Sequence, residues 1–239
     1  MSEKDKPTKT IFRVITYCTV IAVCFNFIAF VSPFWVATKP SDHRQFLRIG
    51  LWTVCFDGYM KPYQYHKAYF GCYYIYYVEY DGVRDWLNPP WLYAVQVMMS
   101  IGLITHAIST FIVICQSVMV FSHANVKTLA TMLFTNFSTG LCILLALIAF
   151  GVESQDSRWI QFPEYNSLSW SYAFAAIAFI ITVAVFCMLV HVFLQVARDL
   201  EMIEKRKLNE TYDSIYPASE KMPTPYDPRS SSPPVYNEV

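Results

Sequence analysis

Long runs without charge are the main pattern along this chain. Four stretches contain no Asp, Glu, Lys or Arg: 25 residues end before Lys39, 41 before Lys127, 25 before Glu153 and 33 before Arg198. A helix needs roughly 20 apolar residues to cross the hydrocarbon core of a bilayer. Each stretch is therefore expected to hold one membrane span. The predicted spans are residues 14–35, 92–120, 129–150 and 172–194, which together form a membrane domain over 14–194.

Composition supports a membrane protein rather than a soluble one. Hydrophobic residues make up 55% of the 239 and charged residues only 15%, well below the roughly 25% of ordinary globular domains. The first span is too long for a cleaved signal peptide, and no small-residue cleavage site follows it. The predicted fold class is membrane all-α, a left-handed bundle of four transmembrane helices, and the cysteines and strand-favouring runs described below add a small disulfide-locked extracellular β-sheet.

The orientation of the bundle follows from its basic residues. Short cytoplasmic flanks carry an excess of Lys and Arg. Both termini are therefore predicted to be cytoplasmic, with a first outer loop at 36–91, a second at 151–171, an inner segment at 1–13 and a disordered tail at 195–239. Nine basic residues close to one face carry this prediction: Lys4, Lys6, Lys9, Arg13, Lys127, Arg198, Lys205, Arg206 and Lys207.

Two of the seven cysteines, Cys55 and Cys72, lie in the first outer loop. Because that loop faces an oxidising compartment, we expect them to form a disulfide. Closing an 18-residue loop stabilises the fold by roughly 3 kcal/mol in the chain-entropy account. The remaining five are expected to pack inside the helices as small apolar residues: Cys18, Cys24, Cys115, Cys142 and Cys187.

Two runs of the first outer loop favour β-strands. Residues 48–56 and 68–80 are rich in aromatic and β-branched side chains, and the turn dipeptides Asp57-Gly58 and Asp81-Gly82 follow them. A sheet of this size needs outside support, which the disulfide and the membrane surface would give. The tryptophans of the loop suit a headgroup-level belt, and the length of the loop favours a recognition surface as well.

One group of residues, at the end of the first span and in the first outer loop, resembles a family signature. The elements occur in this order: Trp35, Gly50-Leu51-Trp52, Cys55 and Cys72. This pattern resembles the claudin superfamily, which includes the claudins, the peripheral myelin and epithelial membrane proteins and the calcium-channel gamma subunits. The resemblance covers about residues 12–193. It implies that the two cysteines bridge two strands, that the second outer loop adds a strand, and that the Trp and Gly-Leu-Trp residues anchor the sheet to the bundle.

The chain also departs from that pattern. The gap between the two cysteines is longer than in most vertebrate claudins, and the helix beginning at Trp91 has Gln96 but lacks the arginine that they usually place near there. Their cysteine cluster at the inner end of the fourth helix is also missing. The chain is therefore more similar to the claudin-like proteins of invertebrate septate junctions.

The last part of the tail, residues 209–239, has a composition typical of disorder. Six of the thirteen prolines lie in it, together with the serine run at 230–232. Within it, Pro233, Pro234 and Tyr236 form a PPxY motif, which WW domains bind as a polyproline helix. This motif predicts a WW-domain scaffold as a cytoplasmic partner.

Two further short signals lie in the tail. Val239, with its free carboxylate, is a candidate PDZ ligand. Tyr212 and Ile215 fit a Tyr-x-x-apolar sorting signal, a pattern that is common by chance.

Polar side chains within the predicted spans are few and uncharged: Asn26, Gln96, His106, Asn136 and His191. Uncharged amides and imidazoles are expected to hydrogen-bond between helices rather than to carry ions. The sequence shows no nucleophile–base pair, metal-ligand cluster or phosphate loop, so we expect neither an enzyme nor a cofactor.

These observations favour a structural protein of cell junctions. It would assemble through its outer loops, with its own kind and with other junction proteins, in one membrane and across the gap between cells. The result would be a paracellular barrier of the septate or tight junction type at lateral plasma-membrane contacts. The alternative is an accessory subunit that modulates a channel or receptor. Equal numbers of basic and acidic residues, 18 each, give no indication of nucleic-acid binding.

Overall fold

The computed structural model describes residues 5–39, 45–61, 64–119, 126–156, 158–159 and 165–215. The chain forms two compact units, Met1–Val196 and Ala197–Val239. The first contains a helical bundle and a sheet, and the second contains the end of the last helix. The fold described below belongs to the first unit except where the second is named.

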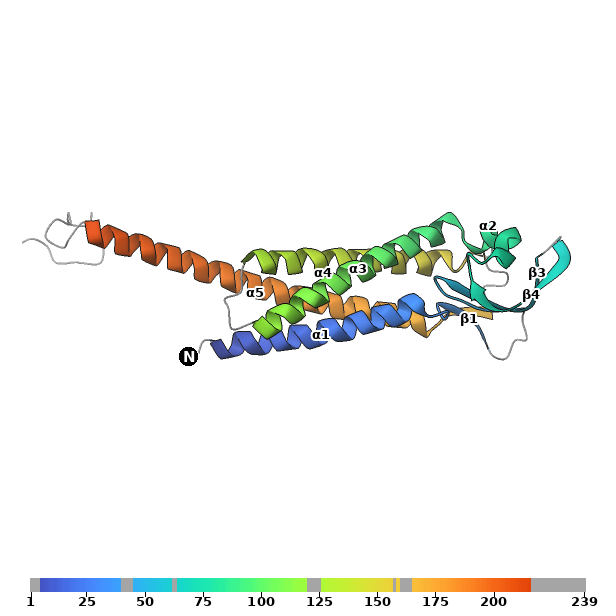
Figure 1. Ribbon diagram of the computed structural model, residues 1–239, viewed down its shortest axis with the longest axis horizontal. Helices are drawn as coiled ribbons and strands as arrows, with labels where there is room; N and C mark the ends of the chain where they lie inside the picture. The colour runs from blue at the N-terminus through green and yellow to red at the C-terminus, as the bar shows by residue number, and fades with distance from the viewer. Residues whose placement is uncertain are drawn as a thin grey trace, which may run out of the picture. The chain divides into compact units, whose positions relative to one another are not determined.

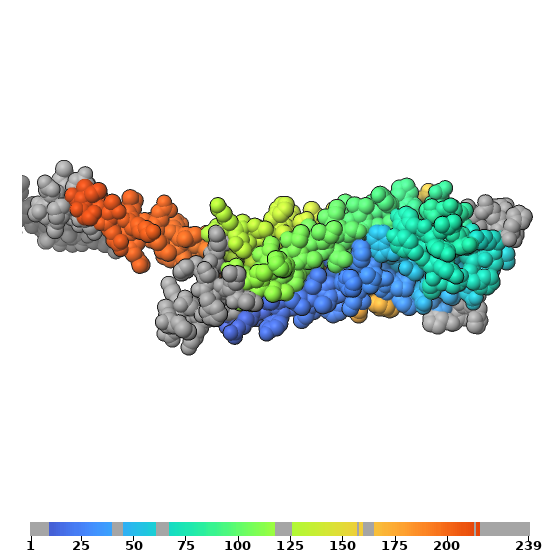
Figure 2. Space-filling view, viewed as in Figure 1, coloured from blue at the N-terminus to red at the C-terminus, as the bar shows by residue number. Residues whose placement is uncertain are grey.

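Four helices form the bundle: α1 (Asp5–Val31), α3 (Pro90–Met119), α4 (Val126–Glu153) and α5 (Trp170–Ile215). Each contains a segment long and apolar enough to cross a membrane, which confirms the four predicted spans. Figure 1 shows the sheet at one end of α1, α3 and α4. In Figure 2 the blue atoms of α1 lie along the green atoms of α3.

The first helix ends earlier than predicted. The predicted span extends to residue 35, but α1 ends at Val31. The amide of Ser32 still donates to the Ile28 carbonyl oxygen at 3.1 Å. Pro33 then has no N–H to continue the helix, so Trp35 lies outside it and directly precedes the first strand.

Five strands form one antiparallel sheet: β1 (Val36–Thr38), β2 (Phe46–Ile49), β3 (Thr53–Lys61), β4 (Gln64–Tyr74) and β5 (Asn166–Leu168). Their order is β4-β3-β2-β1-β5. The first four come from the first outer loop. The fifth comes from the second outer loop and pairs Val36 with Leu168, as the family resemblance implied.

The run 48–56 is two strands rather than the single strand predicted. Gly50, Leu51 and Trp52 form the turn between β2 and β3, closed by a 2.8 Å hydrogen bond from the Gly50 amide to the Thr53 carbonyl oxygen. Gly58 does not end the second strand either. It has a positive φ of 73° and lies where the register with β4 shifts, so it forms a bulge inside β3.

The run 68–80 also differs from its prediction, because β4 ends at Tyr74. A 3₁₀ helix, η1 (Val78–Val83), and a short helix, α2 (Arg84–Leu87), follow. Asp81-Gly82 therefore lies in η1 rather than in a hairpin turn. Burial explains the change, since this conformation buries Tyr80 and Val83, each about 1% exposed.

The last helix is longer than predicted, and this corrects the expectation of disorder from residue 195. α5 continues to Ile215, so Tyr212 and Ile215 are helical. Residues 195–215 contain no Pro or Gly and are rich in strong helix formers, and Lys205 pairs with Glu201 one turn away at 2.7 Å. Pro233, Pro234, Tyr236 and Val239 lie outside the described residues.

Three of the five polar residues predicted to lie within the spans, Asn26, His106 and Asn136, hydrogen-bond between helices as expected. His191 is an exception, since it contacts Gln195 of its own helix at 3.0 Å, and Gln96, described below, is another. Three pairs join neighbouring helices: Asn26–His106 at 3.4 Å, Ser109–Asn136 at 2.6 Å and Thr105–Thr139 at 2.8 Å.

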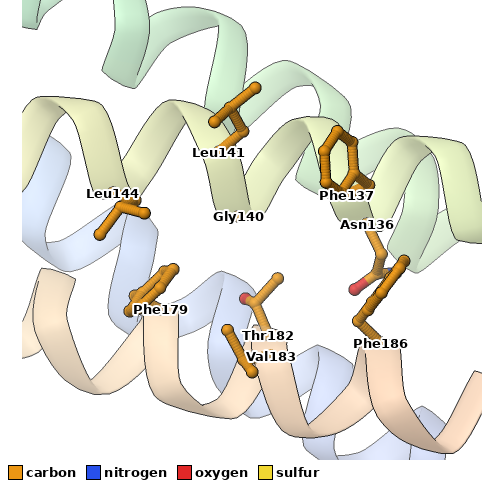
Figure 3. Close-up of a pocket in the computed structure, with 9 residues that line it drawn as sticks. All are labelled: Asn136, Phe137, Gly140, Leu141, Leu144, Phe179, Thr182, Val183 and Phe186. Carbon is orange, nitrogen blue, oxygen red and sulfur yellow. The ribbon is translucent and has the colours of Figure 1, made fainter.

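An apolar groove of about 230 Å³ lies between α4 and α5. Figure 3 shows Phe137 and Phe186 at one end of it and Leu144 and Phe179 at the other. Gly140 lies between them on α4, and a Cβ there would be 3.8 Å from Thr182 of α5. Small residues allow such close approach between membrane helices.

Candidate functional site

The predicted disulfide links two neighbouring strands of the sheet. Cys55 and Cys72 face each other in the register of β3 and β4 and are bonded, which confirms the prediction. Arg48 on β2 lies beside them, with its Nε 3.3 Å from the Cys55 sulfur. Its guanidinium also lies 4.4 Å from the centre of the Phe34 ring, a cation–π contact. The two strands are therefore linked covalently, and the contacts of Arg48 pack around that link.

Trp35 joins the sheet to three helices. Its side chain is fully buried, and its indole Nε1 donates to the Ala29 carbonyl oxygen near the end of α1 at 2.7 Å. The ring centre lies 4.7 Å from that of Phe150 on α4 and 5.8 Å from that of Tyr172 on α5. Both ring pairs are edge-on, the arrangement that aromatic rings favour.

Gly50 allows the β2–β3 turn to lie directly on the end of α1. A Cβ at this position would meet the Ser32 carbonyl oxygen and lie only 2.6 Å from the Pro33 Cα. Both neighbours are backbone atoms, which cannot move aside as a flexible side chain can. The close approach therefore requires glycine.

Gln96 on α3 holds this turn from the other side. Its Nε2 donates to the Leu51 carbonyl oxygen at 2.6 Å, and its Oε1 accepts a hydrogen bond from the Tyr76 hydroxyl at 2.8 Å. Asn88 donates to the same hydroxyl at 2.8 Å. Gln96 was expected to bond another helix, so this role was not predicted. Its place within the first two turns of a helix that directly follows the loop is the signal that could have indicated it.

Trp52 also holds the β2–β3 turn against the end of α1. Its ring centre lies 5.3 Å from that of Phe30 on α1 and 6.3 Å from that of Tyr74 on β4, with only 15° between the planes of the latter pair. Trp159 fixes the second outer loop in a similar way, with its ring centre 4.6 Å from that of Trp91 at the start of α3. Both outer loops are therefore packed onto the helix ends.

A second aromatic cluster lies between the sheet and the η1–α2 segment. It consists of Phe56, Tyr59, Tyr69, Tyr80 and Trp86. The rings of Tyr59 and Trp86 are stacked, with centres 5.3 Å apart and planes 4° apart. Burial raises the pKa of Tyr59 to about 12, and burial also raises the pKa of Tyr80 to about 12. The cluster thus forms a small hydrophobic core of the outer loop.

The outer surface of the sheet presents aromatic side chains on an edge strand. β4 is at one edge of the sheet, and an edge strand offers unpaired backbone groups to a partner. Exposed large side chains on and just after it are Phe70, Tyr73, Tyr74, Tyr77 and Val78. Such a surface is suited to contact with another protein.

Charges around the sheet carry both signs, and several of them are paired. Lys67 pairs with Glu79, Arg84 with Asp81 at 2.5 Å, and Arg158 with Asp156 at 2.7 Å. Among the described residues, no group of three or more His, Cys, Asp or Glu side chains is placed to hold a metal ion. The charged side chains around the sheet thus form pairs of opposite sign.

Comparison with known proteins agrees with this geometry. A family model described as PMP-22/EMP/MP20/Claudin tight junction matches residues 20–192. A search of curated proteins found no match. The matched range includes all five strands, the disulfide, α3 and α4. The chain therefore belongs to the PMP-22/EMP/MP20/Claudin family of multi-pass membrane proteins, which is not a family of enzymes.

Proposed function

We propose that this protein is a structural component of cell junctions that assembles through its outer loops and forms or organises a paracellular barrier. The family supports a junction-associated membrane protein. The departures from the vertebrate claudin pattern support a barrier of the septate junction type. Family membership also supports a place in the plasma membrane, and we propose its lateral contacts as the site.

The observation that carries this proposal is the rigid sheet built from both outer loops. Three features hold it: the disulfide, the pairing of β1 with β5, and the contacts of Trp35, Gly50 and Gln96 with the helix ends. A surface fixed in this way loses little conformational freedom when a partner binds. The exposed aromatic residues of β4 provide apolar contact area for that partner.

The proposed partners are other copies of this chain and other junction membrane proteins, in the same membrane and across the intercellular gap. The paired charges of both signs favour a barrier or organising role over selective ion conduction, because selectivity would require a field of one sign. Cytoplasmic termini would place Pro233, Pro234, Tyr236 and Val239 where WW and PDZ scaffolds can bind them.

Depletion of the protein from an epithelium tests the proposal. We expect an intermediate-sized dextran to leak across the depleted layer, and we expect the protein to lie at lateral contacts in intact tissue. Wild type and Cys142→Ser should both restore the seal, whereas Cys55→Ser should not. A sealed epithelium, with the protein elsewhere on the cell surface, would contradict the proposal and favour the accessory-subunit alternative.

A further inference from the structure

A second groove, of about 450 Å³, lies where the sheet meets the first turns of α3. Its loop side is formed by Trp52, Tyr74 and Tyr76, and its helix side includes Gln96, Ser100 and Ile104. We call it the boundary groove. It is separate from the α4–α5 groove and shares only Tyr74 with the exposed surface of β4 described above.

One wall of the boundary groove is aromatic and held in place by contacts within the protein. Trp52 and Tyr74 lie nearly parallel along it, and Phe30 supports Trp52 with an edge-on contact. Gln96 is held by its bonds to Leu51 and Tyr76. A preformed wall reduces the ordering cost of binding, and its rigid aromatic rings suit a rigid ring system better than a flexible chain.

The polar groups of the boundary groove are neutral. They are the Tyr76 hydroxyl, the Gln96 amide and the Ser100 hydroxyl, and no charged residue is among its lining, all of which the structure describes. This arrangement suits a ligand with one neutral hydroxyl and no charged headgroup.

The boundary groove continues into the lipid-facing side of α3. Val97, Ile101 and Ile104 line it and are 37%, 43% and 60% exposed. α3 begins at Pro90, so the groove starts near the end of the span. From Gln96 to Ile104 the helix rises about 12 Å, and a ligand would reach this surface from the bilayer.

We propose that the boundary groove binds a membrane sterol. The rigid rings would lie against Trp52 and Tyr74, and the single hydroxyl would bond the neutral polar groups around Gln96. A phospholipid would place its phosphate beside a lining that contains no cation, and Arg84, which bonds the Tyr76 carbonyl oxygen, is already paired with Asp81. The proposal does not depend on the junction role, because it concerns the bilayer rather than a partner across the cell gap.

Photolabelling of the full-length protein tests the proposal. The protein is reconstituted in phosphatidylcholine vesicles with a photoreactive cholesterol analogue, and the labelled peptides are mapped. We expect saturable labelling within 93–104 that unlabelled cholesterol competes away. Val97→Phe and Ile101→Phe, which fill the groove from exposed positions, should each reduce the competable labelling about tenfold.

The matched control is Ile108→Phe, on the same helix and 46% exposed but outside the boundary groove. It should leave the labelling unchanged, and all variants should unfold at the same temperature as wild type. A cholesterol epimer with an inverted hydroxyl should compete poorly. Labelling that does not saturate, that survives Val97→Phe and Ile101→Phe, or that a phospholipid analogue reproduces and displaces would overturn the proposal. Crosslinks between two copies at these positions would overturn it as well.

Discussion

The Gln96 side chain is hydrogen-bonded to the Leu51 carbonyl oxygen at 2.6 Å, so a single residue on α3 holds the turn that links β2 to β3. The same side chain accepts a hydrogen bond from Tyr76, just after β4. In the claudins that the chain resembles, an arginine is usual near this position. Here a neutral amide forms the link between sheet and bundle.

Gln96→Leu should therefore destabilise the protein. The substitution leaves the Leu51 carbonyl and the Tyr76 hydroxyl without this partner, and an unsatisfied buried group costs about 1–3 kcal/mol. Thermal unfolding of the purified protein in detergent measures the change. Tyr93→Phe, at a 58% exposed position on the same helix, is the control and should melt with wild type. An unfolding temperature of Gln96→Leu equal to that of wild type would contradict the role assigned to this residue.

Gly50→Ala should destabilise the sheet where it lies on α1. The added Cβ would overlap the Ser32 carbonyl oxygen and approach the Pro33 Cα, and relieving overpacking costs about 1–3 kcal/mol. We expect faster trypsin cleavage of the outer loops in intact vesicles. Gly82→Ala is the matched control, because its Cβ would lie 3.8 Å from the Tyr69 hydroxyl, at ordinary contact distance. Equal cleavage rates for the two variants would be evidence against the close approach.

The cysteines of the denatured protein should react in two groups. Five of the seven are free, so a maleimide should modify five before reduction and seven afterwards, as counted by intact mass. Cys55→Ser should release Cys72 and cost about 3 kcal/mol. Cys142→Ser should leave both the disulfide and the stability nearly unchanged. Modification of seven thiols without reduction would show that the pair is not bonded.

Tyr80→Phe should raise stability slightly. The Tyr80 hydroxyl is buried and has no partner among the described residues, so removing it should gain about 1 kcal/mol or less. Tyr77→Phe, at a 48% exposed position, is the control and should be neutral. A lower melting temperature for Tyr80→Phe would indicate a hydrogen bond that this geometry does not contain.

Alkaline pH should weaken the aromatic cluster of the outer loop. Burial raises the pKa of Tyr59 and of Tyr80 to about 12 from an ordinary value of 10.0. Between these values the unfolded chain has released the phenolic protons and the folded chain has not, so the folded state loses stability as the pH rises. Melting temperatures measured from about pH 9 to about pH 12 check this, and Tyr80→Phe should reduce the slope. A flat profile would contradict the burial of these hydroxyls.

The spans and the disulfide were predictable because each depends on a local or compositional signal. Charge-free length marks the helices, and only Cys55 and Cys72 lie in an outer loop. The pairing of β5 with β1 came from the family resemblance, since Asn166–Leu168 is too short to show a strand pattern of its own. The continuation of α5 to Ile215 was missed because charge ends a membrane span without ending a helix.

The details of the outer loop depend on tertiary contacts. The local sequence places Gly50 in a strand, and only its packing against the end of α1 explains why it forms a turn. The local sequence places Gly58 in a turn, and only the pairing with β4 shows that it forms a bulge. The helical segment that contains Tyr80 forms because its ring is buried against Phe56 and Tyr69. No sequence pattern around Gln96 indicates that its hydrogen-bond partner is Leu51.

The pairing of β1 with β5 also sets an order for biogenesis. Val36 and Leu168 are adjacent in the sheet but are separated by two whole membrane helices in the chain. Strands β1 to β4 emerge early in synthesis, whereas β5 emerges only shortly before α5 inserts. The edge of β1 therefore stays unpaired until both central helices have been made, and a chain that stops before β5 leaves the backbone groups of that edge exposed.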